Sequence, residues 1–192
     1  MKSRNTAAIV LALATVSTAV QAQERIQFAE YSAKFLCGLV KEEGAASVRP
    51  GLYDTSINIH NPQIVSSMTF FKKVVFAPRE GEDPVRPSRF RRDELKADFA
   101  EHVDCKIIRS MLAPPQSGAS FVEGFVVLIA VAAKGISTDL DVVGVYTVSN
   151  PPGQDTDLEM LPATQHVLTF PLATGTKLRD QMLEDSKSNP DK

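Results

Sequence analysis

The sequence predicts an all-β fold: an antiparallel β-sandwich or jelly-roll-like barrel with one short helix near residues 105–112. Three observations predict it. Apolar and polar residues alternate over short segments, these segments recur at intervals of about a dozen residues, and turns rich in Pro and Gly separate them. Long amphipathic helical patterns are missing, which disfavours an architecture with helical layers.

The expected strands are short and evenly spread along the chain. In order, they cover residues 31–38, 52–61, 67–77, 100–103, 121–131 and 138–149, with edge strands at 155–161 and 166–170. In the second strand, Ile57 and Ile59 alternate with Asn58 and His60, which is the period of a half-buried strand.

The segment FVEGFVVLIAV at residues 121–131 is the most apolar in the chain. A near-continuous apolar run is typical of a strand that is central or buried on both faces. Gly124 within it suggests a bulge. Residues 89–99 are ambiguous and fit either a helical turn or an irregular strand.

The remaining elements lie at the short helix and at the two ends of the domain. Asp104 is placed to cap the helix over residues 105–112. We expect a polar lead-in at residues 23–30, a domain over 31–172, and a flexible polar tail over 173–192. That tail contains at most a short helix around Leu178 to Leu183.

The N-terminus has the three-part pattern of a secretory signal peptide over residues 1–22. Lys2 and Arg4 precede an apolar run, and small residues stand where a peptidase cleaving after Ala22 would read them. A membrane anchor is the alternative, but the apolar run is shorter than the roughly 20 residues of a comfortable span. We therefore expect a secreted or periplasmic protein with no transmembrane segment after cleavage.

Charge and cysteine content narrow the class of partner. The chain has 21 Lys and Arg against 23 Asp and Glu, and this acidic balance disfavours binding to nucleic acid or to anionic membranes.

The only cysteines are Cys37 and Cys105. An even number in an exported chain predicts a disulfide, and two buried free thiols are the alternative. Cys37 has no Cys or His nearby and Cys105 has only His102, three residues before it, so a metal site is not expected.

His60 has two interpretations. With Asn58 it forms a candidate polar site at a strand end, able to bind a ligand or a metal. Alternatively, it belongs to an outward polar face, and Asn61-Pro62 shapes the following turn through side-chain-to-backbone hydrogen bonds. We favour the second interpretation.

Hydrolytic and metal motifs are weak in this sequence. The G-x-S-x-G pattern is absent, and bridged cysteines offer no thiolate. The other histidines, His102 and His166, have no spacing that would place ligands together with His60 on one side of a strand or helix. We therefore expect no cofactor and no metal triad.

Carboxylates occur at alternate positions in two places, Asp139/Asp141 and Asp155/Asp157/Glu159. Such sets can supply the acid and base of a glycosidase, and the second set is also a weak calcium candidate, although it lacks the residue order of a calcium loop. The interpretation we favour is a charged edge that discourages pairing with other sheets.

The segment RPSRFRRDELK at residues 86–96 is the most basic in the chain, with five basic residues against Asp93 and Glu94. Guanidinium groups suit phosphate, sulfate or acidic glycans. The alternative is that the arginines only pair with nearby acidic residues. The candidate partner-binding residues are Arg86, Arg89, Phe90, Arg91 and Arg92.

Several segments, taken in order, resemble a group of small exported bacterial β-sandwich proteins without an established activity. They are YSAKFLCG, VRPGLYDTSINIHNP, FFKKVVFA, VDCKII, FVEGFVVL, LDVVGVYTV and the edge Asp157-Leu158-Glu159. The resemblance covers residues 31–161 and implies export and this fold, with Cys37 and Cys105 both in the pattern. In strand order the chain is also similar to the sensory rhodopsin transducer family, which implies a homo-oligomer.

The sequence therefore predicts an exported, non-catalytic binding or assembly module. Its expected partner is a protein or polysaccharide of the cell envelope, approached by the loops at residues 41–51 and 78–92. A hydrolase of cell-wall or extracellular polymer, using the paired carboxylates, is the alternative. A third possibility is a structural component that assembles through exposed strand edges.

Overall fold

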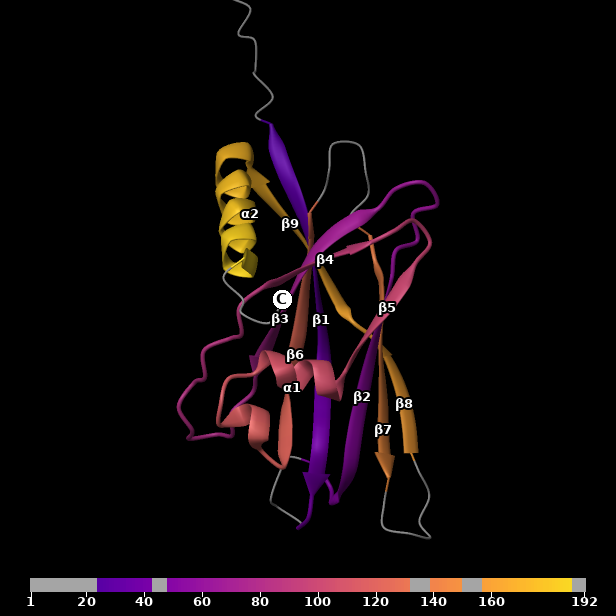
Figure 1. The fold of residues 1–192 in the computed structure, drawn as a ribbon, viewed down its shortest axis with the longest axis vertical. Coiled ribbons are helices and arrows are strands. Elements are labelled where there is room, and N and C mark those ends of the chain that lie inside the picture. Colours follow the sequence, from indigo (N-terminus) through magenta and orange to yellow (C-terminus); the bar gives the residue numbers. More distant parts are fainter. Residues whose placement is uncertain (1–23, 43–47, 132–138, 150–156, 188–192) are drawn as a thin grey trace, which may run out of the picture.

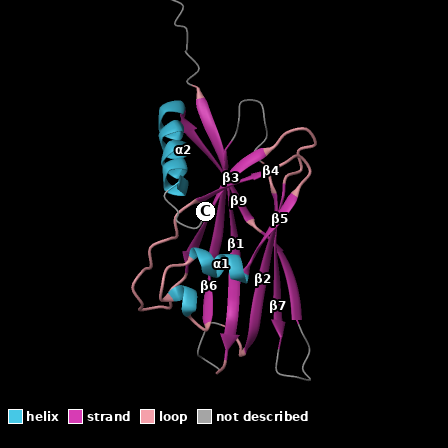
Figure 2. Ribbon diagram, in the orientation of Figure 1, coloured by secondary structure: helices cyan, strands magenta, loops and turns pink. Residues whose placement is uncertain are grey.

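The computed structural model describes residues 24–42, 48–131, 139–149 and 157–187. Its strands are β1 (Arg25–Val40), β2 (Gly51–His60), β3 (Met68–Phe76), β4 (Arg91–Leu95), β5 (Ala100–Asp104), β6 (Phe121–Val131), β7 (Asp141–Ser149), β8 (Asp157–Pro162) and β9 (Thr164–Pro171). The helices are α1 (Cys105–Met111), the short 3-10 turn η1 (Gln116–Gly118) and α2 (Leu172–Lys187). All strand pairings are antiparallel. The predicted all-β fold with a short helix is confirmed (Figure 2).

The central strand is β1, and the sheet divides along it. One edge of β1 pairs with β6 over residues 28–38. The other edge pairs with β9 over residues 25–32 and with β2 only over residues 38–40. One arm therefore contains β4, β3, β6, β1 and β9, and the other contains β5, β2, β7 and β8 (Figure 1).

Where the two arms separate, side-chain hydrogen bonds to the β1 backbone take the place of backbone pairing between strands. Between its two partners on this edge, β1 meets Thr55 of β2 and Tyr146 of β7. The hydroxyl of Thr55 donates to the carbonyl oxygen of Leu36 (2.8 Å) and accepts from the Leu36 N–H (3.0 Å). The hydroxyl of Tyr146 donates to the carbonyl oxygen of Lys34 (2.8 Å). These contacts satisfy backbone groups that would otherwise lack partners inside the fold.

Apolar side chains form two cores, one on each face of the first arm. The main core gathers residues of β1, β2, β3, β5 and β6 with residues of α1. Its members with no measurable exposure are Ala29, Phe35, Cys37, Ile57, Ile59, Phe70, Val74, Val103, Ile108, Val126, Leu128 and Ala130. The second core is smaller and contains Phe28, Phe71, Val127, Ile129 and Met182. Since Met182 belongs to α2, this helix covers the outer face of the arm.

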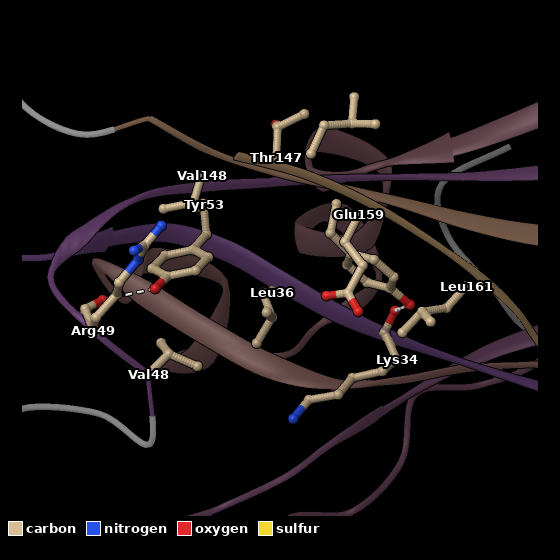
Figure 3. A pocket seen from close by; sticks show the side chains of 11 residues that line it. Lys34, Leu36, Val48, Arg49, Tyr53, Thr147, Val148, Glu159 and Leu161 are labelled. Atoms are coloured by element: carbon tan, nitrogen blue, oxygen red, sulfur yellow. Dashed lines mark hydrogen bonds between the residues drawn. The ribbon is translucent and has the colours of Figure 1, made fainter. Parts of the chain in front are cut away.

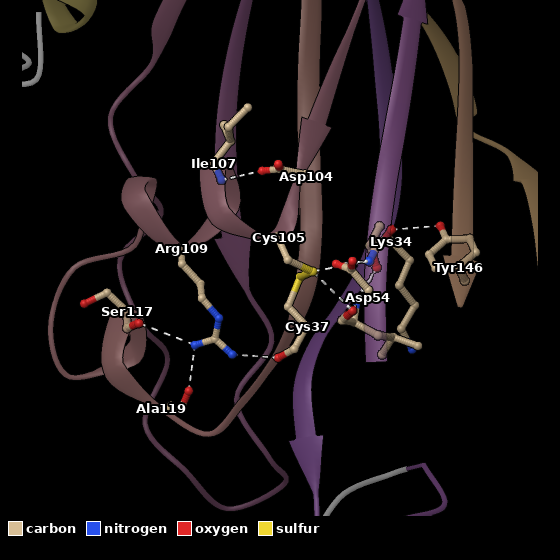
Figure 4. The surroundings of a disulfide bond; sticks show 12 residues. Lys34, Cys37, Asp54, Asp104, Cys105, Ile107, Arg109, Ser117, Ala119 and Tyr146 are labelled. Atoms are coloured by element: carbon tan, nitrogen blue, oxygen red, sulfur yellow. Dashed lines mark hydrogen bonds between the residues drawn. A yellow bond between two sulfur atoms is a disulfide. The ribbon is translucent and has the colours of Figure 1, made fainter. Parts of the chain in front are cut away.

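The predicted disulfide between Cys37 and Cys105 is confirmed, and it joins the end of β1 to the start of α1 (Figure 4). The predicted cap is confirmed too, because the Asp104 carboxylate accepts a hydrogen bond from the Ile107 N–H (2.7 Å). Arg109, which sequence reasoning missed, donates to the carbonyl oxygens of Cys37 (2.8 Å) and Ala119 (2.6 Å). The disulfide and the hydrogen bonds of Arg109 together fix α1 against the end of β1.

Three expectations differ from the structure. The lead-in is already strand, because β1 begins at Arg25 and Phe28 is fully buried beneath α2. The expected flexible tail is instead α2 up to Lys187, held by the buried Met182 and by Gly175, where any Cβ would clash with Ile26. Gly124 marks no bulge, since its register with β1 and β3 is continuous. A Cβ there would lie 2.1 Å from the Val75 carbonyl oxygen, so glycine permits close strand approach.

Neither α1 nor α2 has the length and apolar character that a bilayer crossing requires. The candidate signal peptide lies outside the described residues.

Candidate functional site

His60 lies at the end of β2, between two carboxylates. Its Nδ1 is 3.0 Å from Oδ2 of Asp141, which is the paired residue on β7. Its Nε2 is 3.2 Å from Oδ1 of Asp98, in the turn between β4 and β5. Hydrogen bonds to Asp141 and then to Asp98 raise the pKa of His60 above 6.5. Both ring nitrogens are engaged, so the ring links β2, β7 and the β4–β5 turn.

Asn61, the next residue, is fully buried and organises the turn. Its side-chain amide donates to the carbonyl oxygens of Ser66 (2.9 Å), Lys96 (3.0 Å) and Leu95 (3.2 Å). Its side-chain carbonyl oxygen accepts a hydrogen bond from the Gln63 N–H (3.1 Å). The side-chain-to-backbone hydrogen bonds expected at Asn61-Pro62 are present, and they extend to the distant β4–β5 turn.

The remaining histidines do not converge on His60. His102 lies on β5 opposite Asn58, and His166 lies on β9 opposite Glu30. Within the part of the chain that the structure describes, no group of three or more His, Cys, Asp or Glu side chains is arranged to hold a metal ion. Asn58 is exposed beside His102 and lines none of the three pockets described below.

The carboxylates Asp139 and Asp141 contact different partners. Asp141 is engaged by His60, whereas Asp139 is 3.3 Å from the Gln165 amide nitrogen. Of the calcium candidates, Asp155 lies outside the described residues and only the backbone of Asp157 is described. Glu159 lies in a pocket of its own, which contains no other described carboxylate.

That pocket, the split pocket, lies at the separation of the two arms and has a volume of about 400 Å³. Strands β1, β2, β7 and β8 all contribute to it; the described lining residues are Lys34, Leu36, Val48, Arg49, Tyr53, Tyr146, Thr147, Val148, Leu158, Glu159 and Leu161. Arg49 and Tyr53 lie at one end, Lys34 and Glu159 at the other, and Leu36 between them (Figure 3). Desolvation, and then the charge of Glu159, raise the pKa of Tyr146.

A second pocket, the arginine pocket, has a volume of about 440 Å³ and lies between the β3–β4 connection and the end of α1. Its described lining is Val85, Arg86, Pro87, Ser88, Arg89, Arg91, Ser110, Met111, Leu112, Ala113, Pro114 and Gln116. No acidic side chain is among these residues. Three of the five candidate partner-binding residues therefore meet in one place.

The other two candidates, Phe90 and Arg92, point elsewhere. Phe90 packs edge-on against Phe71 with ring centres 6.3 Å apart, and Lys73 lies 4.8 Å from its ring centre. Its backbone N–H donates to Asp185 of α2 (3.0 Å). Arg92 contacts Thr69 and lies 3.9 Å from Glu94. Phe90 is thus an anchor that fixes the basic segment to the second core.

The neighbouring acidic residues Asp93 and Glu94 do not line the arginine pocket. Asp93 lies 3.0 Å from the ammonium of the buried Lys72, which also contacts Glu101 at 3.1 Å. Arg91 donates to the backbone carbonyl of Ser110 at the end of α1 (3.2 Å). This contact holds the β4 end of the pocket against the helix, a pairing that the sequence did not indicate.

The two long loops do not form one binding surface. The described part of the first contributes Val48 and Arg49 to the split pocket, whereas the second contributes residues 85–89 to the arginine pocket. A third pocket, of about 170 Å³, is lined by residues that include Arg79, Glu82 and Glu123.

No protein-family model matches the chain, and no curated protein does. Among solved structures, the chain is similar to the crystal structure of Thermotoga maritima 1070, with a TM-score of 0.40 and 9% sequence identity. The alignment covers 72% of this chain and 92% of the other. A likeness at this level does not extend to function.

Proposed function

We propose that this protein is an exported, non-catalytic binding module that captures an anionic group of an envelope polysaccharide in the arginine pocket. The observation that carries the proposal is the meeting of Arg86, Arg89 and Arg91 in a pocket whose described lining contains no carboxylate. Export is supported by the leader-like N-terminus, and the Cys37–Cys105 bridge is compatible with an oxidising compartment.

The chemistry of the pocket favours sulfate, phosphate or carboxylate groups. A guanidinium carries five N–H donors in a planar fork that matches such oxyanions. Arg91 also donates to the hydroxyl and to the backbone carbonyl of Ser110, which fixes its guanidinium at the edge of the pocket. Ser88, Ser110 and Gln116 add polar groups to the same wall. Apolar neighbours such as Pro87 and Met111 reduce local solvation, which strengthens an ion pair.

The segment is also held in place before a ligand arrives. Phe90 is packed into the second core, and the Ser88 hydroxyl accepts a hydrogen bond from the Val74 N–H (2.8 Å). A site with fixed side chains loses less conformational entropy on binding than a mobile loop would. These contacts support binding as the role of the segment.

The test is titration calorimetry of the mature protein with oligogalacturonate, inorganic sulfate and neutral maltoheptaose. We expect oligogalacturonate to bind, to weaken as salt rises, and to outcompete the neutral sugar. Arg86→Gln with Arg89→Gln should weaken binding by about tenfold or more. Arg79→Gln is the matched control, because Arg79 lies on the same connection but lines a different pocket.

Far-UV circular dichroism and melting temperature establish that each variant is folded. An unchanged affinity in the folded double variant, or the absence of binding by both anionic probes, would overturn the proposal.

A further inference from the structure

Among the strands that the structure describes, β8 ends the sheet and has no partner on its outer edge. Leu158 and Met160 are 63% and 62% exposed, and Leu161 is 46% exposed. Edge strands are commonly protected by charge, proline or a covering loop because they otherwise recruit another strand. Glu159 and Pro162 give β8 some of this protection, but its three exposed apolar side chains leave it able to accept another strand.

The open edge borders the split pocket. Leu158, Glu159 and Leu161 line this pocket together with Leu36 and Tyr146 from the other strands. On β8, Glu159 and Leu161 lie opposite Tyr146 and Gly144 of β7. A strand added to the open edge would place alternate side chains beside Glu159 and Leu161, at the mouth of the pocket.

The pocket offers mainly carbon surface along its length. The hydroxyl of Tyr53 donates to the carbonyl oxygen of Arg49 (2.7 Å), and that of Tyr146 donates to the carbonyl oxygen of Lys34 (2.8 Å). Both hydroxyls are engaged by backbone carbonyls, and the two rings add apolar surface to the lining. A bulky apolar side chain matches this lining.

The carboxylate of Glu159, at the β8 end of the split pocket, favours a basic residue near the apolar residue of an added strand. The Lys34 ammonium lies 3.6 Å from Glu123 on β6, whereas Glu159 is exposed at the pocket wall. A second copy of this chain would instead bring its own Glu159 carboxylate into the new ladder, and like charges that face each other destabilise a strand pair. The charge pattern thus favours a foreign strand over self-association.

We infer that β8 and the split pocket form a second binding site, for an extended peptide with a bulky apolar residue and a basic residue two positions away. The peptide adds to the open edge through its backbone, its apolar side chain enters the split pocket, and its basic side chain lies beside Glu159. Strand addition of this kind gives affinity through main-chain hydrogen bonds and specificity through alternate side chains. This site shares no described residue with the arginine pocket.

A displayed library of random nonapeptides, selected on the mature protein, tests the inference. We expect enrichment of peptides in which Lys or Arg stands two residues from Leu, Ile, Met or Phe. A synthetic peptide from the enriched pool should bind the folded Glu159→Lys variant at least about tenfold more weakly. Selection on that variant should replace the basic residue by Asp or Glu. Glu80→Lys, on the β3–β4 connection, is the control and should behave like the unaltered protein.

Three outcomes would overturn the inference: no enrichment, an enriched motif that Glu159→Lys leaves unchanged, or a dimer in sedimentation equilibrium that the peptide does not dissociate. The last would mean that a second copy occupies the edge. Because Arg86 and Arg89 are intact in all these proteins, loss of peptide binding is distinguishable from failure of the anion site.

Discussion

The hydroxyl of Thr55 is expected to hold the two arms of the sheet together, and Thr55→Val tests this. Valine keeps the shape and the β-branch but cannot donate to or accept from Leu36. Thr55 is 1% exposed, and two backbone groups of Leu36 lose their partner. A buried group left without a hydrogen bond costs about 1–3 kcal/mol. Leu36 itself is half-buried, so water partly replaces the hydroxyl, and we expect a loss of about 2–3 kcal/mol in the free energy of unfolding.

Thr55→Ser is the matched control. It keeps both hydrogen bonds and removes one methyl group, which costs about 1 kcal/mol. Urea unfolding followed by far-UV circular dichroism measures both variants, since the chain has no Trp to report the transition. Equal slopes against urea concentration allow the midpoints to be compared directly. The reasoning is refuted if the valine variant is as stable as the serine variant or more so.

Two further predictions concern the bridge and His60. The double variant Cys37→Ala/Cys105→Ala should lose about 4 kcal/mol of unfolding free energy in the chain-entropy model, because the bridge spans a sequence separation of 68 residues; a urea midpoint close to that of the oxidised protein would contradict this. The pKa of His60 is raised in the folded protein, so its stabilisation is complete below about pH 6.5 and is lost as pH rises through the folded pKa. The melting temperature of His60→Gln should therefore fall furthest below that of the unaltered protein at pH 5 and approach it at pH 9. A gap that widens with pH would show that the sign is wrong.

The sequence predicted elements whose signal is local. Ile57 and Ile59 alternate with polar residues, so β2 was recognised within one residue at each end. Asp104 caps α1 from the adjacent position, which is also a local pattern. The helix α2 gave no comparable signal, because its buried positions are Gly175, Met182 and Ser186, and only one of these is a large apolar residue.

The parts of the candidate sites that were missed depend on distant residues. His60 contacts Asp98 and Asp141, which are 38 and 81 positions away in the chain. The sequence indicated the arginines of the arginine pocket, but not Ser110 and Gln116, which come from α1 and η1. The split pocket exists because β1 and β2 separate after three paired residues, and alternation along either strand does not reveal where a ladder stops.

The place of β1 in the sheet also constrains how the chain folds. Although β1 precedes the other described strands, it forms its longest pairings with β6, which begins at Phe121, and with β9, which begins at Thr164. Long loops must close before these contacts form, and proteins dominated by such contacts fold in milliseconds to seconds rather than microseconds. The pairing of β3 with β4 closes a shorter loop, over residues 77–90. The strand β1 therefore acquires its full set of neighbours only when β9 has joined the sheet.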